Sequence, residues 1–345
     1  MSFPTVTTVL PTYRRPEMLR RAIESALAQT YPHLRVCVYD NASGDGTREV
    51  VTELAERDSR VTYHCHPENI GSALNFQYGV THVETECFSV LSDDDVLLPG
   101  CYEAAVAELE KSPEAAFAAN KVLLRDDQGR VLPALPRWDP GYYRPPEGLL
   151  RMVTHGQPVW TGAVFRTAVF ETVGHLDLDI PLGLDSEFLF RVAKRMPYVL
   201  TPAPGAIFTA HSLATDRGII DFDLIWPASF RMISKITEDE SLPGSVRREF
   251  AQRLGAIFKR ALFANGVKYL YRGRFEEADK TSLMLRQRFP RSGEALTMPL
   301  LSRICQRWPF VLETLRLAFA TRSRLRQAGT QDLREEFSVA GQASA

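Results

Sequence analysis

Short apolar runs rich in β-branched residues alternate with longer segments of helical periodicity in the first part of the chain. The runs occupy residues 6–10, 34–40, 60–65 and 87–91. Each predicts a strand. After the first run, Leu19, Ile23 and Leu27 recur at every fourth position and predict a helix. Pro16 suits the first turn of that helix. This alternation predicts an α/β fold whose mostly parallel sheet is flanked by helices on both faces.

A change of pattern near residue 220 predicts where the sheet domain ends. Beyond it, strand-like runs stop and apolar residues keep helical spacing. We expect an α/β domain over residues 1–220, an α-helical extension over 221–326 and a disordered polar tail over 327–345. Residues 265–290 have the spacing of one tetratricopeptide unit. Because such solenoids need at least about three units, we favour a helical hairpin packed on the first domain.

Composition and charge exclude several classes of protein. A chain of 345 residues, 45% of them hydrophobic, has enough apolar material for one large core and a smaller unit. Its formal net charge of −1 argues against nucleic-acid binding, which needs clustered Lys and Arg. A secretory leader is not expected, and no apolar run reaches the roughly 18 residues of a spanning helix. The five cysteines are scattered without C-x-x-C pairs, which predicts reduced thiols and a cytoplasmic protein.

Polar residues follow three of the predicted strands. They occupy positions 11–14, 40–41 and 92–95. In an open parallel sheet, ligands bind beyond the carboxyl ends of the strands. We therefore expect these three segments to meet at one edge of the sheet and to form a ligand site.

Three consecutive aspartates, Asp93, Asp94 and Asp95, stand just after the fourth apolar run. Carboxylates about 5 Å apart, at an effective dielectric constant near 20, repel by roughly 3 kcal/mol per pair, so the triplet favours a bound cation. Mg²⁺ and Mn²⁺ prefer oxygen ligands and often take one or two carboxylates together with water and phosphate oxygens. The alternative is that the aspartates cap the next helix. A helix starting at Pro99 would, however, have Leu98 at the capping position.

Several motifs follow one another along the chain. Neither G-x-G-x-x-G nor G-x-x-x-x-G-K-[ST] occurs. The chain instead has VLPTYRRPEMLRRAIESALAQTYPHLRVCVYDNASGDGT, NIGSALNFQYGV, LSDDDVLLPG, TGAVFRTAVFETVG and GLDSEFLFRVAKR, in this order. Over roughly residues 5–215 this succession resembles the inverting family 2 glycosyltransferases of the nucleotide-diphospho-sugar transferase (GT-A) fold. The resemblance implies a Rossmann-like, mostly parallel GT-A sheet flanked by helices.

The resemblance also implies which residues contact a nucleotide-sugar donor. Those that would line the base and ribose pocket are Pro11, Thr12, Tyr13 and Arg14. Asp40 would hydrogen-bond the base. Asn69 and Gly71 would lie at the diphosphate and the donor sugar, with Asp93 also on the donor side.

A divalent metal, Mn²⁺ or Mg²⁺, is implied as the cofactor. By the resemblance Asp94 would hold it, helped by Asp93 or Asp95. The family often has an aspartate where this chain has Ser92, so the site is expected to shift toward those two neighbours. His211 resembles a later metal-binding or diphosphate-binding histidine, and the alternative is a solvated histidine at a strand end. The two histidines of YHCH at 63–66 lack a third ligand for a zinc site, so we expect them at the surface or at the edge of the core.

The resemblance assigns the general base to Asp185 and an acceptor-side loop to Gly162. An inverting transfer needs a base that takes the proton of the acceptor hydroxyl as its oxygen attacks the anomeric carbon. The apolar spacing around Asp185 predicts the first turn of a helix, close to a cleft. The alternative is that Asp185 or Ser186 only caps this helix, and Glu187 is a weaker candidate base. Leu184 stands where the family commonly has a glutamate.

We expect a metal-dependent inverting hexosyltransferase. It would move one sugar from a nucleotide-diphosphate sugar, with a UDP-sugar as the first expectation, to a saccharide or lipid-linked acceptor in surface polysaccharide or glycan biosynthesis. Processive synthases carry Q-x-x-R-W, but here Ile304 replaces the glutamine. Trp160 could stack on an acceptor sugar or belong to the core. The alternatives are a catalytically silent sugar-nucleotide-binding scaffold and a nucleotidyltransferase, which would carry a Gly- and Lys-rich loop in place of PTYRRPE.

The segment 291–326 combines basic and apolar residues. It holds seven arginines against two glutamates, interleaved with leucines and aromatic residues. This pattern suits a helix on an anionic membrane surface or on a partner, so peripheral contact with the inner membrane face is a second expectation for its location. The alternative is an amphipathic helix docked on its own domain.

Overall fold

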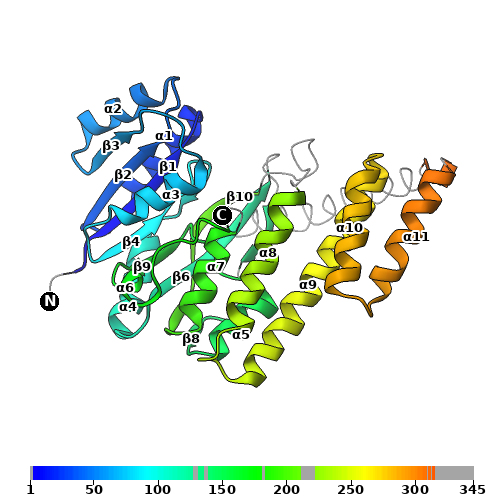
Figure 1. Cartoon of the computed structure of the whole chain (residues 1–345). Helices are drawn as coiled ribbons and strands as arrows, with labels where there is room; N and C mark the ends of the chain where they lie inside the picture. The colour runs from blue at the N-terminus through cyan, green and yellow to red at the C-terminus, as the bar shows by residue number, and fades with distance from the viewer. Residues whose placement is uncertain are drawn as a thin grey trace, which may run out of the picture. The chain divides into compact units, whose positions relative to one another are not determined.

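The computed structural model describes residues 3–126, 131–135, 139–180, 183–210, 222–308, 310–311 and 313–314 (Figure 1). The chain divides into two compact units, Met1–Leu254 and Gly255–Ala345. The boundaries that we expect at residues 220 and 326 stay predictions. His211 and the expected tail at 327–345 lie outside the described residues.

Strands and helices alternate along the first unit, and helices alone follow. The strands are β1 (Val6–Thr12), β2 (Leu34–Asp40), β3 (Val61–Cys65), β4 (Cys87–Val90), β5 (Val96–Leu97), β6 (Phe117–Asp126), β7 (Val131–Leu135), β8 (Gly141–Tyr143), β9 (Ala163–Arg166) and β10 (Tyr198–Ala210). The helices are α1 (Pro16–Leu27), α2 (Thr47–Arg57), α3 (Ser72–Thr81), α4 (Cys101–Lys111), α5 (Glu147–His155), α6 (Val169–Val173), α7 (Leu184–Ala193), α8 (Phe222–Thr237), α9 (Gly244–Tyr271), α10 (Phe275–Arg288) and α11 (Gly293–Arg307).

The strands form one sheet in the order β3-β2-β1-β4-β9-β6-β10-β5, with β7 beside β6 and β8 beside β10 (Figure 1). β1 is parallel to β2 and β4, and β2 is parallel to β3. β9 is antiparallel to both β4 and β6, so β6, and β10 parallel to it, run in the direction of β1. Most strands therefore share one direction. This confirms the predicted α/β fold with a mostly parallel sheet and flanking helices.

Strand β1 is buried along its whole length because helices cover both faces of the sheet. On one face, Val6 and Leu10 belong to the main core together with Leu19 and Ile23 of α1. The side chain of Val9 points to the other face of the sheet, where it contacts α3. The helix predicted after the first strand is confirmed as α1.

Helix α3 comes very close to the sheet at Gly79. A Cβ built at this glycine would lie 2.5 Å from Val9 Cγ1 and 3.1 Å from Tyr39 Cδ2. Both of these side chains are buried, so neither has open space to move into. The missing side chain at Gly79 is therefore what allows α3 to rest on β1 and β2.

The described part of the second unit is helical, as the sequence predicts. Ser302 Oγ of α11 donates to Asp279 Oδ1 of α10 at 2.6 Å. Gly266 of α9 leaves space for α10 and α11, because a Cβ there would lie 2.7 Å from Thr281 Cγ2 and 2.9 Å from Met298 Sδ. The expected packing of this unit on the first one stays a prediction. None of the helices within the described ranges has both the length and the apolar character needed to cross a membrane.

Replacing Gly79 by alanine should destabilise the protein by about 1–3 kcal/mol, because the new methyl group overlaps Val9 in a packed interface. On an exposed helix the same change would stabilise by about 1 kcal/mol. Urea denaturation measures the difference. Gly293→Ala is the matched control, because this glycine is also helical, in α11, and a Cβ there meets nothing within 4 Å. An unchanged free energy of unfolding in Gly79→Ala would contradict the close approach of α3.

Candidate active site

The loops that follow β1, β2 and β4 meet at one edge of the sheet. Thr12 is paired with Asp40 at the ends of β1 and β2, and Val9 is paired with Val90 across β1 and β4. The three polar segments predicted to converge at the carboxyl ends of these strands are therefore brought together.

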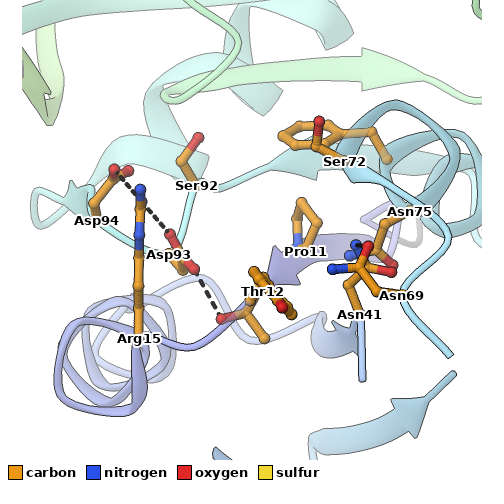
Figure 2. Close-up of a pocket in the computed structure, with 12 residues that line it drawn as sticks. Pro11, Thr12, Arg15, Asn41, Asn69, Ser72, Asn75, Ser92, Asp93 and Asp94 are labelled. Atoms are coloured by element: carbon orange, nitrogen blue, oxygen red, sulfur yellow. Dashed lines mark hydrogen bonds and ion pairs between the residues drawn. The ribbon is translucent and has the colours of Figure 1, made fainter. Parts of the chain in front are cut away.

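A cavity of about 360 Å³ opens at this edge, and we call it the aspartate cavity. Its lining residues are Pro11, Thr12, Tyr13, Arg15, Asn41, Asn69, Ser72, Asn75, Phe76, Ser92, Asp93 and Asp94 (Figure 2). They come from the end of β1, the loop after β2, the start of α3 and the loop after β4. Several of the residues predicted from the sequence for the donor side share this cavity.

The side chain of Arg15 extends from just after the end of β1 to Asp93 and Asp94 (Figure 2). Its Nη1 donates to Asp93 Oδ1 at 3.1 Å and to Asp94 Oδ2 at 2.7 Å. Asp93 Oδ2 accepts a hydrogen bond from Thr12 Oγ1 at 2.8 Å. Burial raises the pKa of Asp93, although Thr12 and Arg15 oppose the rise. The guanidinium of Arg15 therefore forms ion pairs with two carboxylates that are mostly shielded from water.

Asp95 is buried and does not belong to the lining of the aspartate cavity. Its Oδ2 accepts from Thr161 Oγ1 at 2.6 Å and its Oδ1 from the Thr209 backbone N–H at 2.8 Å. Thr209 Oγ1 also donates to the backbone oxygen of Asp94 at 2.7 Å. Burial raises the pKa of Asp95 to about 7 despite these hydrogen bonds. This carboxyl group fastens the loop after β4 to β10 and to the segment before β9.

The alternative reading of the aspartates as helix caps is wrong. Helix α4 begins at Cys101, two residues later than the start considered from the sequence. Its N-cap is Gly100, in a left-handed conformation with φ 77°, and no side chain caps it. The aspartates are therefore too far from the first turn to satisfy its N–H groups.

Two asparagines order the loop that leads into α3. Asn41 Nδ2 donates to Asn69 Oδ1 at 2.9 Å, and Asn41 Oδ1 accepts from the Ile70 backbone N–H at 2.8 Å. The Gly71 backbone N–H donates to Asn69 Oδ1 at 2.9 Å. Gly71, with φ 86°, is the N-cap of α3. The asparagines thus hold the beginning of α3, and with it Ser72, beside the aspartate cavity.

Asp40 is buried and lines a different cavity, of about 590 Å³, which we call the β2 cavity. Its Oδ1 accepts from the backbone N–H of Ser43 at 3.0 Å and from Ser43 Oγ at 2.5 Å. Its Oδ2 accepts from Tyr63 OH at 2.6 Å. Arg14 is tied to the same serine, with its backbone N–H on Ser43 Oγ and its Nε on the Ser43 backbone oxygen. Arg14 and Asp40 are thus linked through Ser43, apart from the aspartate cavity lining.

A third cavity, of about 210 Å³, adjoins the aspartate cavity and contains Asp185. We call it the α7 cavity. It is lined by Ser72, Ala73, Phe76, Val90, Ser92, Val159, Trp160, Thr161, Leu176, Gly183, Leu184, Asp185 and Phe208. Ser72, Phe76 and Ser92 line both cavities, so the aspartates and Asp185 face two spaces with a common wall.

Asp185 is an exposed residue in the first turn of α7, as the sequence predicts. Its Oδ1 accepts from the Ser186 backbone N–H at 2.7 Å and from Ser186 Oγ at 3.3 Å. The N-cap is Gly183, with φ 120°, so the alternative in which Asp185 or Ser186 caps the helix is wrong. Glycine suits this position because a side chain at such a φ would be strained.

Glu187 lies one half-turn further along α7 and is 3% exposed. Its Oε2 pairs with Arg191 Nη2 at 2.7 Å and its Oε1 with Lys235 Nζ of α8 at 2.6 Å. Lys235 also pairs with Asp177 at 2.6 Å. The buried carboxylate of Glu187 is therefore engaged in an ionic network that joins α7 to α8. The carboxylate of Asp185, by contrast, is exposed.

Trp160 and Gly162 lie beside Thr161 before β9. Trp160 is 6% exposed, and its ring packs on Phe165 and Phe188 at centroid distances of 5.2 and 5.3 Å. Its indole N–H finds no acceptor among the described residues. Gly162 has φ 85°, and its carbonyl oxygen accepts from Asn120 Nδ2 at 3.0 Å. Trp160 is thus core material that also forms part of the α7 cavity wall.

The residues that could hold a metal are the two aspartates of the aspartate cavity. In the described part of the chain no group of three His, Cys, Asp or Glu side chains is arranged to hold a metal ion. The rings of His64 and His66 lie 4.8 Å apart, and His64 stacks on Tyr78 whereas His66 meets the Tyr78 ring edge-on. His66 Nε2 is 3.0 Å from Asn75 Oδ1. Those histidines form an aromatic cluster at the edge of the core.

The residue that the sequence reading missed is Arg15. In the sequence it differs in no visible way from Arg14, and only the fold separates them, since one faces the aspartates and the other Ser43. Ser72, Asn75 and Phe76 were also unassigned. The signal for them was the quoted motif NIGSALNFQYGV, in which they occupy the helix face three and four residues apart.

Part of this chain is similar to known glycosyltransferases. Residues 7–174 match the family described as Glycosyl transferase family 2. An uncharacterized glycosyltransferase of Rickettsia felis is 36% identical over 108 residues, which are 31% of this chain and 18% of that protein. The GalNAc(5)-diNAcBac-PP-undecaprenol beta-1,3-glucosyltransferase of Campylobacter jejuni is 33% identical over 98 residues, 28% of this chain and 32% of that protein. The matched part thus spans a third or less of these two relatives.

Solved structures extend the likeness over most of the chain. The crystal structure of S. aureus TarS 1-349 superposes with a TM-score of 0.63 at 13% identity, over 88% of this chain and 91% of that chain. Structures of the same TarS fragment in complex with UDP-GlcNAc and with UDP have TM-scores of 0.63 and 0.59. At this identity the likeness shows a common fold.

Proposed function

We propose, on the premise that residues 7–174 form a family 2 glycosyltransferase domain with the GT-A fold, that this protein is a metal-dependent inverting glycosyltransferase. It moves one sugar from a nucleotide-diphosphate sugar to a saccharide or lipid-linked acceptor. The observation that carries the proposal is the common wall of the aspartate and α7 cavities. A donor in the first and an acceptor in the second would place the reacting atoms beside each other, as a direct displacement requires.

The donor is a UDP-sugar in this proposal, and the TarS complexes with UDP-GlcNAc and UDP support it. We expect Thr12 and Tyr13, which line the aspartate cavity, to contact the nucleoside, and Asn69 and Gly71 to contact the diphosphate and sugar. Asp40 has its carboxylate engaged by Ser43 and Tyr63. Its contact with the base would therefore require one of these hydrogen bonds to be exchanged.

The donor atoms present fit a hard divalent cation. Two carboxylates, Asp93 and Asp94, line the same cavity, and Arg15 is hydrogen-bonded to both. Mg²⁺ and Mn²⁺ commonly bind one or two carboxylates and take their other oxygens from water and substrate phosphates. When bound, the metal would supply positive charge for the leaving diphosphate. Asp94 would hold it with Asp93, and His211 stays a proposed ligand outside the described residues.

Asp185 is the proposed general base. It takes the proton of the acceptor hydroxyl while that oxygen forms its bond to the anomeric carbon. The bond from the anomeric carbon to the diphosphate oxygen breaks in the same step, and its electron pair leaves with the nucleoside diphosphate. Ser186 occupies Oδ1, and among the described residues Oδ2 accepts no hydrogen bond, so Oδ2 is available for the proton.

Replacing Asp185 by asparagine should lower donor turnover by about 10²–10⁴-fold while UDP affinity stays unchanged, because only proton transfer is removed. The measurement is release of the corresponding nucleoside diphosphate from UDP-, GDP- and dTDP-sugars, with calorimetric titration of UDP. Asp179→Asn is the control, since Asp179 is exposed, pairs with Arg231 and lines none of the three cavities. If the wild type binds a donor without turning it over, the scaffold alternative replaces the enzyme. If turnover survives in Asp185→Asn, another group is the base.

Removing the metal should weaken UDP binding at least tenfold in the wild type, and Asp94→Asn should bind UDP with the same low affinity with or without Mn²⁺. The reason is that the diphosphate and Asp94 are proposed to share the cation. Titration of UDP in EDTA and in Mn²⁺ measures both. Equal UDP affinity of the wild type under the two conditions would exclude metal-dependent donor binding.

The second unit is proposed to contact an anionic membrane through α11. Leu296, Leu300, Arg303 and Arg307 lie at spacings of three and four residues, hence on one face of the helix, and all are exposed. Leu296 is 67% and Leu300 57% exposed. Leucines beside arginines suit the boundary between lipid headgroups and acyl chains.

Membrane contact predicts that the protein co-sediments with phosphatidylglycerol vesicles at low salt but not with phosphatidylcholine vesicles. Leu296→Glu with Leu300→Glu should reduce the bound fraction at least fivefold. The control is Leu283→Glu, on α10, whose side chain is also exposed. Equal sedimentation of the wild type with both vesicle types would reject the role of anionic lipid. Sedimentation with neither would reject the membrane in favour of a protein partner or intramolecular docking.

A further inference from the structure

Arg15 lies beside two of the carboxylates that line the aspartate cavity. It is the one basic residue among the described residues that line this cavity. It stands at the N-cap of α1, where the chain turns from β1 into the helix, and its side chain points from there to the aspartates (Figure 2). The neighbouring Arg14 is directed elsewhere, with its Nε on the Ser43 backbone oxygen and its guanidinium 5.0 Å from the Tyr13 ring centre.

A single nitrogen of Arg15 serves both carboxylates. Nη1 is 3.1 Å from Asp93 Oδ1 and 2.7 Å from Asp94 Oδ2. The side chains of Asp93 and Asp94 are 9% and 12% exposed, whereas that of Arg15 is 43% exposed. The guanidinium is therefore the more exposed partner of two shielded carboxylates, and it is bonded to oxygens that a cation would need.

The guanidinium of Arg15 keeps its positive charge at this position. Burial lowers the pKa of its guanidinium, but Asp93 and Asp94 raise it by more, so it is held above its ordinary value. A divalent cation that bound the same two oxygens would meet this fixed charge at short range, where the repulsion is strong. The guanidinium and the metal therefore compete for the same pair of carboxylates unless another anion takes the guanidinium.

We propose that Arg15 is a tethered counter-ion that excludes a divalent cation from Asp93 and Asp94 until a nucleotide diphosphate is present. The inference rests on the proposed function, because the diphosphate is the anion that takes over Arg15. A guanidinium binds phosphate oxygens at least as well as carboxylates, so the exchange keeps its hydrogen bonds. Metal and donor then bind together, and each raises the affinity for the other by the same factor.

The test compares Mn²⁺ binding by electron paramagnetic resonance in the wild type and in Arg15→Gln, with Mn²⁺ alone and with Mn²⁺ plus UDP. Arg15→Gln should bind Mn²⁺ alone at least tenfold more tightly than the wild type. The factor by which UDP tightens Mn²⁺ binding should fall at least tenfold in this variant. Arg21→Gln is the matched control, because it removes an exposed arginine of the same helix and should leave both quantities unchanged.

A second variant separates charge from shape. Arg15→Lys keeps a positive charge on the same backbone position and should bind Mn²⁺ alone within about threefold of the wild type. The proposal is overturned if Arg15→Gln binds Mn²⁺ alone no more tightly than the wild type. It is also overturned if Arg15→Lys binds as tightly as Arg15→Gln, since the charge would then not be the cause.

The same titrations keep this inference apart from the proposed function. If the wild type binds no UDP with Mn²⁺ present, the donor assignment fails, and with it the exchange onto the diphosphate. The comparison with Mn²⁺ alone still decides whether Arg15 excludes the cation. If UDP binds but Arg15→Gln does not change Mn²⁺ affinity, the donor assignment stands and the counter-ion role is rejected.

Discussion

Concentrated negative charge in the loop after β4 is the constraint on which the rest of the site depends. Three adjacent carboxylates remain together because their partners offset the repulsion. Asp93 and Asp94 share Arg15, Asp93 also accepts from Thr12, and Asp95 has separate partners. These partners come from β1, the start of α1, the segment before β9 and β10. Satisfying the charge therefore also draws together the four segments that surround the candidate site. The aspartate that is most deeply buried, Asp95, is the one that holds the structure rather than the one that faces the cavity.

Rigid elements position the exposed chemical groups of this protein. Asp185 is open to solvent, but the helix that carries it is held by the buried pairing of Glu187 with Arg191 and Lys235. Similarly, α3 is seated on the sheet through the absent side chain of Gly79. In both helices, a packed or ionic contact on one side holds the exposed side that lines the candidate site. A substitution at that contact would displace the residues of the candidate site although it does not touch them.

Periodicity in the sequence was sufficient to predict the first four strands, the first helix and the place of Asp185 in a helical turn, because these depend on neighbours within a few residues. The convergence of the polar segments followed from the topology of parallel strands. Partners far apart in the chain were not accessible in this way. Arg15 and Asp94 are 79 residues apart, and Thr161 and Asp95 are 66 apart. Which of two adjacent arginines reaches the aspartates depends on the turn after β1, for which hydrophobic spacing carries no information.

The wall shared by the aspartate and α7 cavities restricts how this protein can acquire new specificity during evolution. A substitution at Phe76 or Ser92 reshapes both spaces at once. With the donor in the aspartate cavity and the acceptor in the α7 cavity, as proposed, a variant selected for a different donor would inherit a changed acceptor site as well. Positions that border only one space, such as Asn41 on one side and Leu176 on the other, are free of this linkage. Separate divergence of the two preferences would therefore leave its mark on these outer positions first, with the dividing wall conserved among descendants.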